Sequence, residues 1–249
     1  MILSWDGYRD MWEPCLTLYR RYWPDCPYPM FLVTQSGMVA DPRVTTLPVG
    51  PGLAWSDGAR LAMRALEHTY VLLMLDDFLL SGPVASAVVE ARRRELDRRQ
   101  GAYLRLVPLP RPTARVPDCP EIGEHEPGVP FRASLQAAFW RRTSFLTLLA
   151  PRESCWEFER HASVRSASLD APFYTTRRPA LRYVDALARG RWSPRGRRLC
   201  RREGLSVDPA RPSVPLGRRL ARVAGRVRLA LRGPMSWRLR RALRRLARL

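Results

Sequence analysis

Two neighbouring acids, Asp76 and Asp77, end an apolar run that reads YVLLMLDDFLL from Tyr70 to Leu80. Carboxylate oxygens are ligands that Mg²⁺ and Mn²⁺ prefer, and such a pair can hold either cation against the phosphates of a diphosphate substrate. The cation then neutralises the charge that develops on a leaving diphosphate. The structural alternative is an acid pair that only ends a strand and caps the segment after it.

The elements before the acid pair alternate between helix and strand. Apolar residues at helical spacing predict a helix over 8–22, and a strand is predicted over 29–35. A helix over 56–68 then precedes the strand over 70–75 that ends at the acids. This order favours an α/β fold with a largely parallel sheet covered on both faces, in which ligands bind beyond the carboxyl ends of the strands.

The second half of the chain is less regular. We expect a helix over 84–100, a strand over 102–110 and a helix over 134–150. Residues 180–203 predict two short helices, and DPARPSVP at 208–215 has the composition of a linker.

Charge is distributed unevenly along the 249 residues. The net charge is +20, yet residues 1–188 hold 23 Arg against 21 acids, whereas residues 189–249 hold 20 Arg against two. The five cysteines are widely spaced and form no C-x-x-C pair, so neither a disulfide framework nor a zinc site is indicated. With no long uncharged apolar run and no signal-like start, a reducing cytoplasm is the expected location.

Five segments taken in order resemble a family of bacterial sugar transferases related to the GT-A glycosyltransferases. They are WDGYRDMWEPCLTLYRRYWPDCPYPMFLVT, VLLMLDDFLL, FRASLQAAFWRRTSFLTLL, ESCWEFE and YVDALARGRW. The similarity covers about residues 1–212. It implies a Rossmann-like nucleotide-binding fold, a nucleotide-sugar donor, and an acid motif that binds Mn²⁺ or Mg²⁺ together with the diphosphate.

The acid signature of this family is usually D-x-D, whereas this chain reads LDD. The departure favours Asp77 as the metal ligand and places Asp76 nearer the ribose or a metal-bound water. It leaves open how strongly the reaction would depend on metal. We therefore expect a GT-A-like domain over 1–212 and a separate basic segment over 213–249.

A second group of acids lies in ESCWEFERH, residues 153–161. Ser154 and Glu157 have the spacing of a capping box, which gives Glu157 a structural explanation. An inverting sugar transfer needs a carboxylate that takes the proton of the acceptor hydroxyl, whereas retention needs no base in that place. The resemblance assigns this role to Glu159 or Glu157. We prefer Glu159, because Glu157 already has a capping role and Glu159 has no comparable structural explanation.

Further candidate residues follow from their places in the resembling family. Donor-binding candidates are Ser4, Asp6, Trp55, Ser56 and Arg60. Gln136 is a candidate for hydrogen bonding to a sugar hydroxyl, and Trp140 for packing on a sugar face. The alternatives are a turn role for Asp6, a surface role for Arg60 and core positions for Trp55 and Trp140.

The basic segment repeats apolar residues at helical spacing. Leu216, Leu220, Val223, Val227 and Leu231 form one stripe among arginines. A basic amphipathic helix of this kind is typical of peripheral binding to an anionic membrane, here the inner face of the cell membrane. A helix packed on the body or on a partner is the second interpretation. Nucleic acid is the least favoured partner, because aromatic residues do not interleave with the arginines.

Together these features predict a metal-assisted glycosyltransferase that moves a sugar from a nucleotide-sugar donor to a glycan or lipid-linked acceptor. The alternative, from a different class, is a nucleic-acid-binding or scaffold protein that acts through its arginine-rich segment on a degenerate transferase fold.

Overall fold

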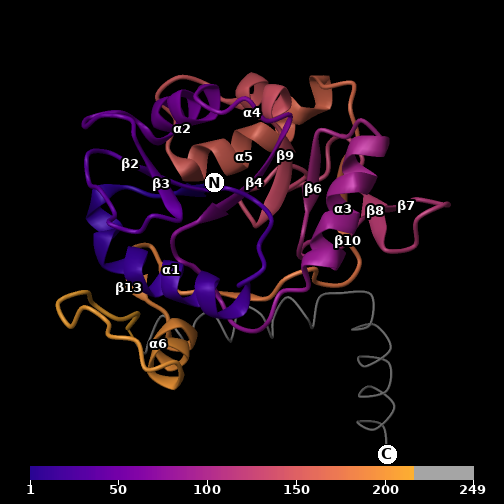
Figure 1. Ribbon diagram of the computed structural model, residues 1–249. Coiled ribbons are helices and arrows are strands. Elements are labelled where there is room, and N and C mark those ends of the chain that lie inside the picture. The colour runs from indigo at the N-terminus through magenta and orange to yellow at the C-terminus, as the bar shows by residue number, and fades with distance from the viewer. Residues whose placement is uncertain (216–249) are drawn as a thin grey trace, which may run out of the picture.

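The computed structural model describes residues 1–215, and their centre is a mixed sheet (Figure 1). Its strand order is β3-β2-β1-β4-β9-β6-β10-β8-β7. The strands are β1 (Ile2–Leu3), β2 (Met30–Thr34), β3 (Val44–Pro48), β4 (Tyr70–Leu75), β6 (Tyr103–Arg105), β7 (Ala114–Arg115), β8 (Ile122–Glu124), β9 (Ala138–Arg141) and β10 (Phe173–Thr176). Strands β3, β2, β1 and β4 are mutually parallel, whereas β9 is antiparallel to both β4 and β6. The predicted α/β fold is confirmed at this level.

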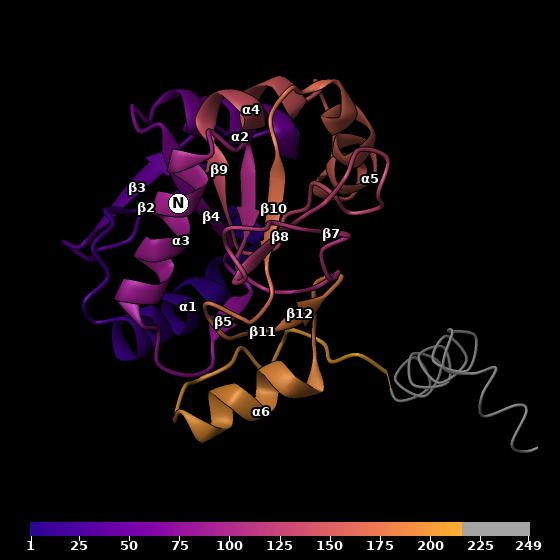
Figure 2. The ribbon, with the colours of Figure 1, turned by 90° about the vertical axis from the view of Figure 1, so that its right-hand side faces the viewer.

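Helices cover both faces of the sheet (Figures 1 and 2). One face carries α1 (Arg9–Tyr22) and α3 (Ser86–Arg98), and the other carries α2 (Trp55–Arg64), α4 (Arg142–Leu148) and α5 (Cys155–Arg165). Helix α6 (Pro194–Arg202) lies beyond α1 and packs against residues 183–185. Alternate residues of β4 enter different cores: Leu72 and Met74 join the first, Val71 and Leu73 the second. This two-sided burial explains why β4 is apolar at nearly every position.

The segment 134–150 differs from the predicted helix. Residues 138–141 form β9, which is inserted between β4 and β6, and only then does α4 begin at Arg142. Phe139 faces one core while Ala138 and Trp140 face the other, which is the alternation of a strand. The apolar spacing that suggested a helix is therefore a local coincidence, overridden by pairing with two neighbouring strands.

Residues 180–203 also differ from the prediction, because only one helix forms there. Strand β11 (Tyr183–Asp185) pairs with β5 (Phe78–Leu80), a hairpin of β12 (Leu187–Ala188) and β13 (Arg191–Trp192) follows, and α6 ends the segment. These short strands contain too few residues to show a period in the sequence.

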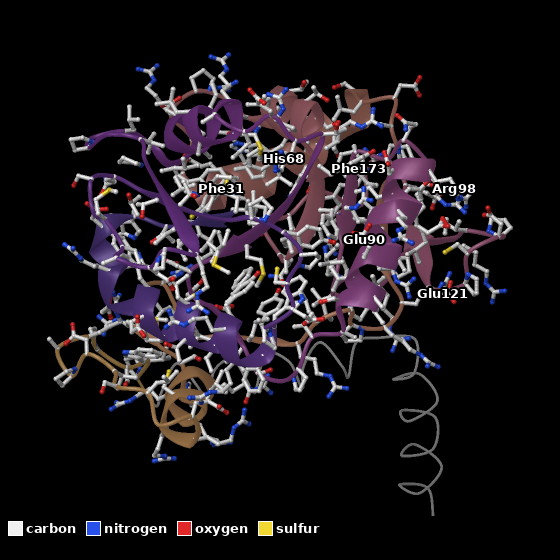
Figure 3. All side chains as sticks on the ribbon, in the orientation of Figure 1. Phe31, His68, Glu90, Arg98, Glu121 and Phe173 are labelled. Carbon is white, nitrogen blue, oxygen red and sulfur yellow. The ribbon has the colours of Figure 1, made fainter. Side chains whose placement is uncertain are left out.

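Helix α3 shows how so polar a sequence folds. Val89 and Leu96 are fully buried, whereas Arg98 is exposed and points away from the sheet (Figure 3). Glu90 is half-buried and accepts a hydrogen bond from the hydroxyl of Tyr28 at 2.8 Å. Arg93 pairs with Glu90 at 2.8 Å, three residues apart on the helix. The predicted helix over 84–100 is confirmed, whereas the predicted strand over 102–110 shortens to β6 because Pro108 and Pro110 cannot donate to a ladder.

The expected linker at 208–215 is packed against the body. Arg211 forms a salt bridge with Asp10 and stacks over the ring of Tyr8, with its guanidinium 4.7 Å from the ring centroid. Val214 N–H donates to the carbonyl of Trp192 at 3.0 Å. The predicted amphipathic helix from Leu216 onward lies outside the described residues. Within 1–215, no helix has the length and apolarity needed to cross a membrane.

Candidate functional site

The two acids lie where the chain leaves the central sheet. Asp76 and Asp77 form the turn between β4 and β5, and Asp76 N–H donates to the carbonyl of Leu3 at 3.3 Å. The hydroxyl of Ser4 donates to the carboxylate of Asp76, and it accepts a hydrogen bond from the indole N–H of Trp12 at 2.6 Å. The carboxyl ends of β1 and β4 thus meet at one polar point, as ligand sites in open α/β sheets do.

Both acids have raised pKa values. Burial raises the pKa of Asp76 to about 7, although the hydrogen bond from Ser4 opposes this shift. The pKa of Asp77 lies well above its ordinary value because of burial and the negative charges of Asp76 and Asp185. No salt bridge within residues 1–215 includes Asp76 or Asp77. Asp76 is buried and Asp77 partly buried, and Arg211, which acts on the charge of Asp76, forms its own salt bridge with Asp10, so the acid pair is a candidate for binding a cation.

Asp185 is a site residue that sequence reasoning missed. It ends β11, where it pairs across the small sheet with Phe78, and Ala186 N–H donates to the carbonyl of Asp77 at 2.8 Å. A hydrogen bond links the side chains of Asp77 and Asp185. The available signal was an acid after a short apolar pair in YVDALARGRW, but more than 100 residues separate it from Asp77. Only strand pairing reveals their proximity.

A cavity of about 750 Å³ opens beyond these acids. Its wall includes Ser4 after β1, Gln35 after β2, four residues between β3 and α2, and Gln136; the four are Val49, Gly50, Leu53 and Ala54. Trp55 lines it too and packs on Phe158, with ring centroids 5.2 Å apart. The volume falls within the range usual for small-molecule sites. Of the predicted donor and substrate residues, the structure brings Ser4, Trp55, Asp76, Asp77 and Gln136 together here.

The two glutamates of α5 have different surroundings. The carboxylate of Glu157 accepts hydrogen bonds from Ser154 N–H at 2.8 Å and from the Ser154 hydroxyl at 2.7 Å, which confirms the predicted capping box. Glu159 accepts one hydrogen bond, from Leu135 N–H at 2.9 Å. Both glutamates line the inner cavity, but the carboxylate of Glu159 has no capping role.

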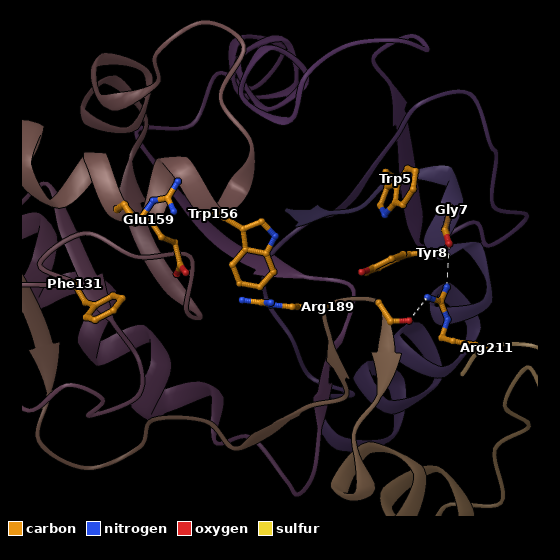
Figure 4. A pocket seen from close by; sticks show the side chains of 10 residues that line it. Trp5, Gly7, Tyr8, Phe131, Trp156, Glu159, Arg189 and Arg211 are labelled. Carbon is orange, nitrogen blue, oxygen red and sulfur yellow. Dashed lines mark hydrogen bonds between the residues drawn. The ribbon is translucent and has the colours of Figure 1, made fainter. Parts of the chain in front are cut away.

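A second, outer cavity of about 930 Å³ adjoins the first (Figure 4). Five residues line both cavities: Trp5, Tyr8, Trp156, Glu159 and Arg189. In Figure 4, Trp156 and Arg189 lie between Glu159 on one side and Tyr8 on the other. Glu159 consequently stands at the boundary between an inner compartment that contains the acids and an outer one.

Two residues that were predicted to bind the nucleotide-sugar donor instead stabilise the fold. The carboxylate of Asp6 accepts hydrogen bonds from the backbone N–H groups of Gln35, Ser36 and Gly37, at 2.9 to 3.1 Å. These bonds fix the loop after β2, and Asp6 lines neither cavity. Its turn role was the stated alternative. Arg60 also lines neither cavity, because its guanidinium donates to the carbonyls of Leu146 and Leu149.

Two more expectations are corrected by burial. Ser56 is fully buried, and its hydroxyl accepts a hydrogen bond from Glu153 N–H at 2.9 Å, which ties α2 to the loop before α5. Trp140 is fully buried in β9 and packs against Tyr103 at a centroid distance of 4.4 Å. A ring without exposed surface cannot pack on a sugar.

The residues present fit a cation only in cooperation with a substrate. Within residues 1–215, no three His, Cys, Asp or Glu side chains are placed to hold a metal ion among themselves. The carboxyl groups of Asp76, Asp77 and Asp185 nevertheless supply oxygen atoms of the kind that Mg²⁺ and Mn²⁺ prefer, and all three line the inner cavity. Mg²⁺ commonly binds in this way, through one or two carboxylates with substrate phosphates completing its shell.

No protein-family model matches this sequence, and no curated protein matches it. Among solved structures, S. aureus TarS residues 1–349 match with a TM-score of 0.46 at 11% identity, covering 73% of this chain. The same protein in complex with UDP matches with a TM-score of 0.47 at 11% identity, covering 74% of this chain. In both cases 58% of the TarS chain is covered. The bifunctional IspDF from Campylobacter jejuni matches more weakly, with a TM-score of 0.32 at 9% identity. This match covers 56% of the present chain and 35% of the IspDF chain.

Proposed function

We propose that this chain is a GT-A-like glycosyltransferase that moves a sugar from a nucleotide-diphosphate donor to an acceptor hydroxyl with inversion. One observation carries the proposal. The buried Asp76 and the half-buried Asp77 occupy the inner end of a cavity at the carboxyl ends of parallel strands, and a carboxylate, Glu159, stands at its boundary with a second cavity. An acid-lined donor compartment, a base and a separate acceptor compartment are what an inverting transfer requires.

The nucleotide is proposed to bind beside β1, β2 and β3, with its diphosphate near Asp77 and Asp185. The proposed Mn²⁺ or Mg²⁺ ion would offset the charge of the leaving diphosphate there. Asp76, held by Ser4, is proposed to lie nearer the ribose or a metal-bound water, and Trp55 forms part of the wall. Gln136, whose side chain accepts a hydrogen bond from the hydroxyl of Tyr183, is held in place to contact the donor sugar.

Glu159 is the proposed general base. Its carboxylate removes the proton of the acceptor hydroxyl as the acceptor oxygen bonds to the anomeric carbon. The bond between that carbon and the diphosphate oxygen breaks on the opposite face, and the electron pair leaves with the diphosphate. The hydrogen bond from Leu135 N–H fixes one oxygen of Glu159, so the other can point to the acceptor.

The test compares two glutamates on one helix. A panel of nucleotide sugars with Mn²⁺ is screened for binding and donor hydrolysis, followed by transfer assays on the wild type, Glu159→Gln and Glu157→Gln. We expect Glu159→Gln to keep donor binding and to lose transfer by about 100-fold or more. Glu157→Gln should affect stability more than rate. Near-normal turnover in Glu159→Gln, with the product's anomeric configuration matching the donor's, would refute inversion through this base.

The acceptor is proposed to be a glycan or a lipid-linked sugar at an anionic membrane surface on the cytoplasmic side. The sequence supports this location, because residues 216–249 contain 12 Arg and no acid. Flotation of the full chain with vesicles of anionic lipid at low salt tests it. The competing nucleic-acid or scaffold role predicts that Asp77→Asn retains cellular function while deletion of 213–249 abolishes it.

A further inference from the structure

The outer cavity exposes aromatic rings that the inner cavity's chemistry does not require. Trp5, Phe131 and Trp156 line it with exposed fractions of 51%, 53% and 58%. Large aromatic side chains are informative when they are exposed together around a concavity, because folding normally buries them. Aromatic faces supply flat apolar surfaces on which the C–H faces of a sugar can pack.

Two arginines stand beside these rings. Arg160 and Arg189 line the outer cavity, and neither guanidinium group has a salt bridge or hydrogen bond to another described residue. Arg211 also lines this cavity, but it already forms a salt bridge with Asp10. The outer cavity therefore presents two guanidinium groups that can donate hydrogen bonds to a ligand, although the charge of Arg160 also acts on the nearby carboxylate of Glu157.

The backbone of Arg189 has an energetically unfavourable conformation. Arg189 and Gly190 form the two-residue turn of the β12–β13 hairpin, and both have positive φ, 52° and 73°. A type I′ turn of this kind favours Asn or Gly at its first position, and a longer side chain there costs about 1 kcal/mol. An Arg at this position points its guanidinium into the shared wall of both cavities.

We propose that the outer cavity is an acceptor subsite for a saccharide that carries an anionic group, a phosphate or a carboxylate. This inference rests on the proposed transferase function and specifies its acceptor. Trp156 and Trp5 pack on the sugar, Arg160 and Arg189 bind the anionic group, and the acceptor hydroxyl then faces Glu159. Planar guanidinium groups suit phosphate and carboxylate oxygens because they can donate two parallel hydrogen bonds.

The experiment measures saccharide binding without any donor, by quenching of tryptophan fluorescence. The probes are glucose, glucose 6-phosphate, glucuronic acid, glucose 1-phosphate and inorganic phosphate. We expect each anionic sugar to bind about tenfold more tightly than glucose, with a preference that weakens as NaCl rises. Preference for glucose 1-phosphate indicates a sugar linked through its anomeric phosphate, as on a lipid carrier. Preference for the other two indicates an anionic substituent on a glycan.

Variants separate the parts of the subsite. Arg160→Gln and Arg189→Gln should each lower affinity for the preferred anionic sugar about fivefold, leaving glucose unchanged. Trp156→Leu should weaken all sugars. Arg115→Gln is the matched control, because Arg115 is an exposed arginine on the far edge strand β7 and lines neither cavity. Circular dichroism confirms that each variant is folded.

Three results would overturn the inference: equal affinity for glucose and the anionic sugars, a preference that survives loss of both arginines, or inorganic phosphate binding as tightly as the sugar phosphates. Nucleotide binding with Mn²⁺ is measured separately. A protein that binds a nucleotide sugar but shows no anionic preference retains the proposed function and loses this inference. A protein that binds no nucleotide loses the proposed function, whatever the outer cavity binds.

Discussion

The inner and outer ends of the adjoining cavities differ in how their polar side chains are held. At the inner end, Asp76 is buried and fixed by Ser4, which Trp12 fixes in turn. At the outer end, Arg160 and Arg189 are exposed, and their guanidinium groups have no hydrogen bond or salt bridge to another described residue. A rigid, acidic interior suits a ligand with invariant parts, such as a diphosphate with its cation. A more open, cationic rim suits a ligand recognised by charge and an apolar face.

The largest expected effect tests the acid at the inner end. Asp77→Asn keeps the shape of the side chain and removes its charge, so metal-dependent donor hydrolysis should fall by about 100-fold or more. The melting temperature without metal should not fall, because the substitution removes a charge repelled by Asp76 and Asp185. Thermal melts and hydrolysis assays on the same preparation check both. A variant that loses activity only because it has melted contradicts this interpretation.

The next effect concerns the side chain that fixes Asp76. Ser4→Ala removes the hydroxyl that donates to Asp76 and accepts from Trp12. We expect a loss of about 1–2 kcal/mol in the free energy of unfolding, measured by urea titration, and about a tenfold loss in donor affinity. Thr17→Ala is the control, because the hydroxyl of Thr17 likewise donates to a carboxylate, that of Glu13, and accepts one hydrogen bond, from Arg20, but Thr17 lines neither cavity. If both variants lose equally little, Ser4 does not position the acid.

The inner and outer ends should contribute differently to the pH dependence of the protein's stability. The pKa of Asp76 rises from an ordinary value near 4 to about 7 in the folded protein. Between these values the folded state binds more protons than the unfolded state, so this carboxyl stabilises the fold most below pH 4. That contribution is lost as pH rises through 7. In metal-free buffer, Asp76→Asn should flatten this part of the stability profile, whereas Arg160→Gln should leave its shape unchanged.

The smallest expected effect concerns the backbone strain at Arg189 in the β12–β13 hairpin. Arg189→Asn places a residue that the type I′ turn favours, so the strain of about 1 kcal/mol disappears and the melting temperature should rise by about 2–4 °C. Arg191→Asn, on the neighbouring strand with ordinary φ, should give no increase. Stabilisation in Arg189→Asn together with weaker binding of anionic sugars would show that the turn trades stability for ligand recognition. An unchanged or lower melting temperature would contradict the strain argument.

The sequence determined the features that depend on neighbouring residues. An apolar run followed by Asp76 and Asp77 predicted a strand that ends at polar chemistry, and the spacing of Ser154 and Glu157 predicted a cap. Both are present, because each depends on residues within one turn or strand. The alternation of helix and strand before residue 80 likewise predicted a sheet covered on both faces.

Tertiary structure decided which candidates share a site. Asp185 reaches Asp77 through strand pairing across more than 100 residues, and Arg189 faces the cavities through a hairpin too short to show a period. Trp140 was lost from the predicted site because β9 inserts between two strands and buries it. Local propensity reports on neighbours in sequence, whereas burial and cavity walls depend on contacts between distant segments. The acids were therefore visible in the sequence, but their partners and the second cavity were not.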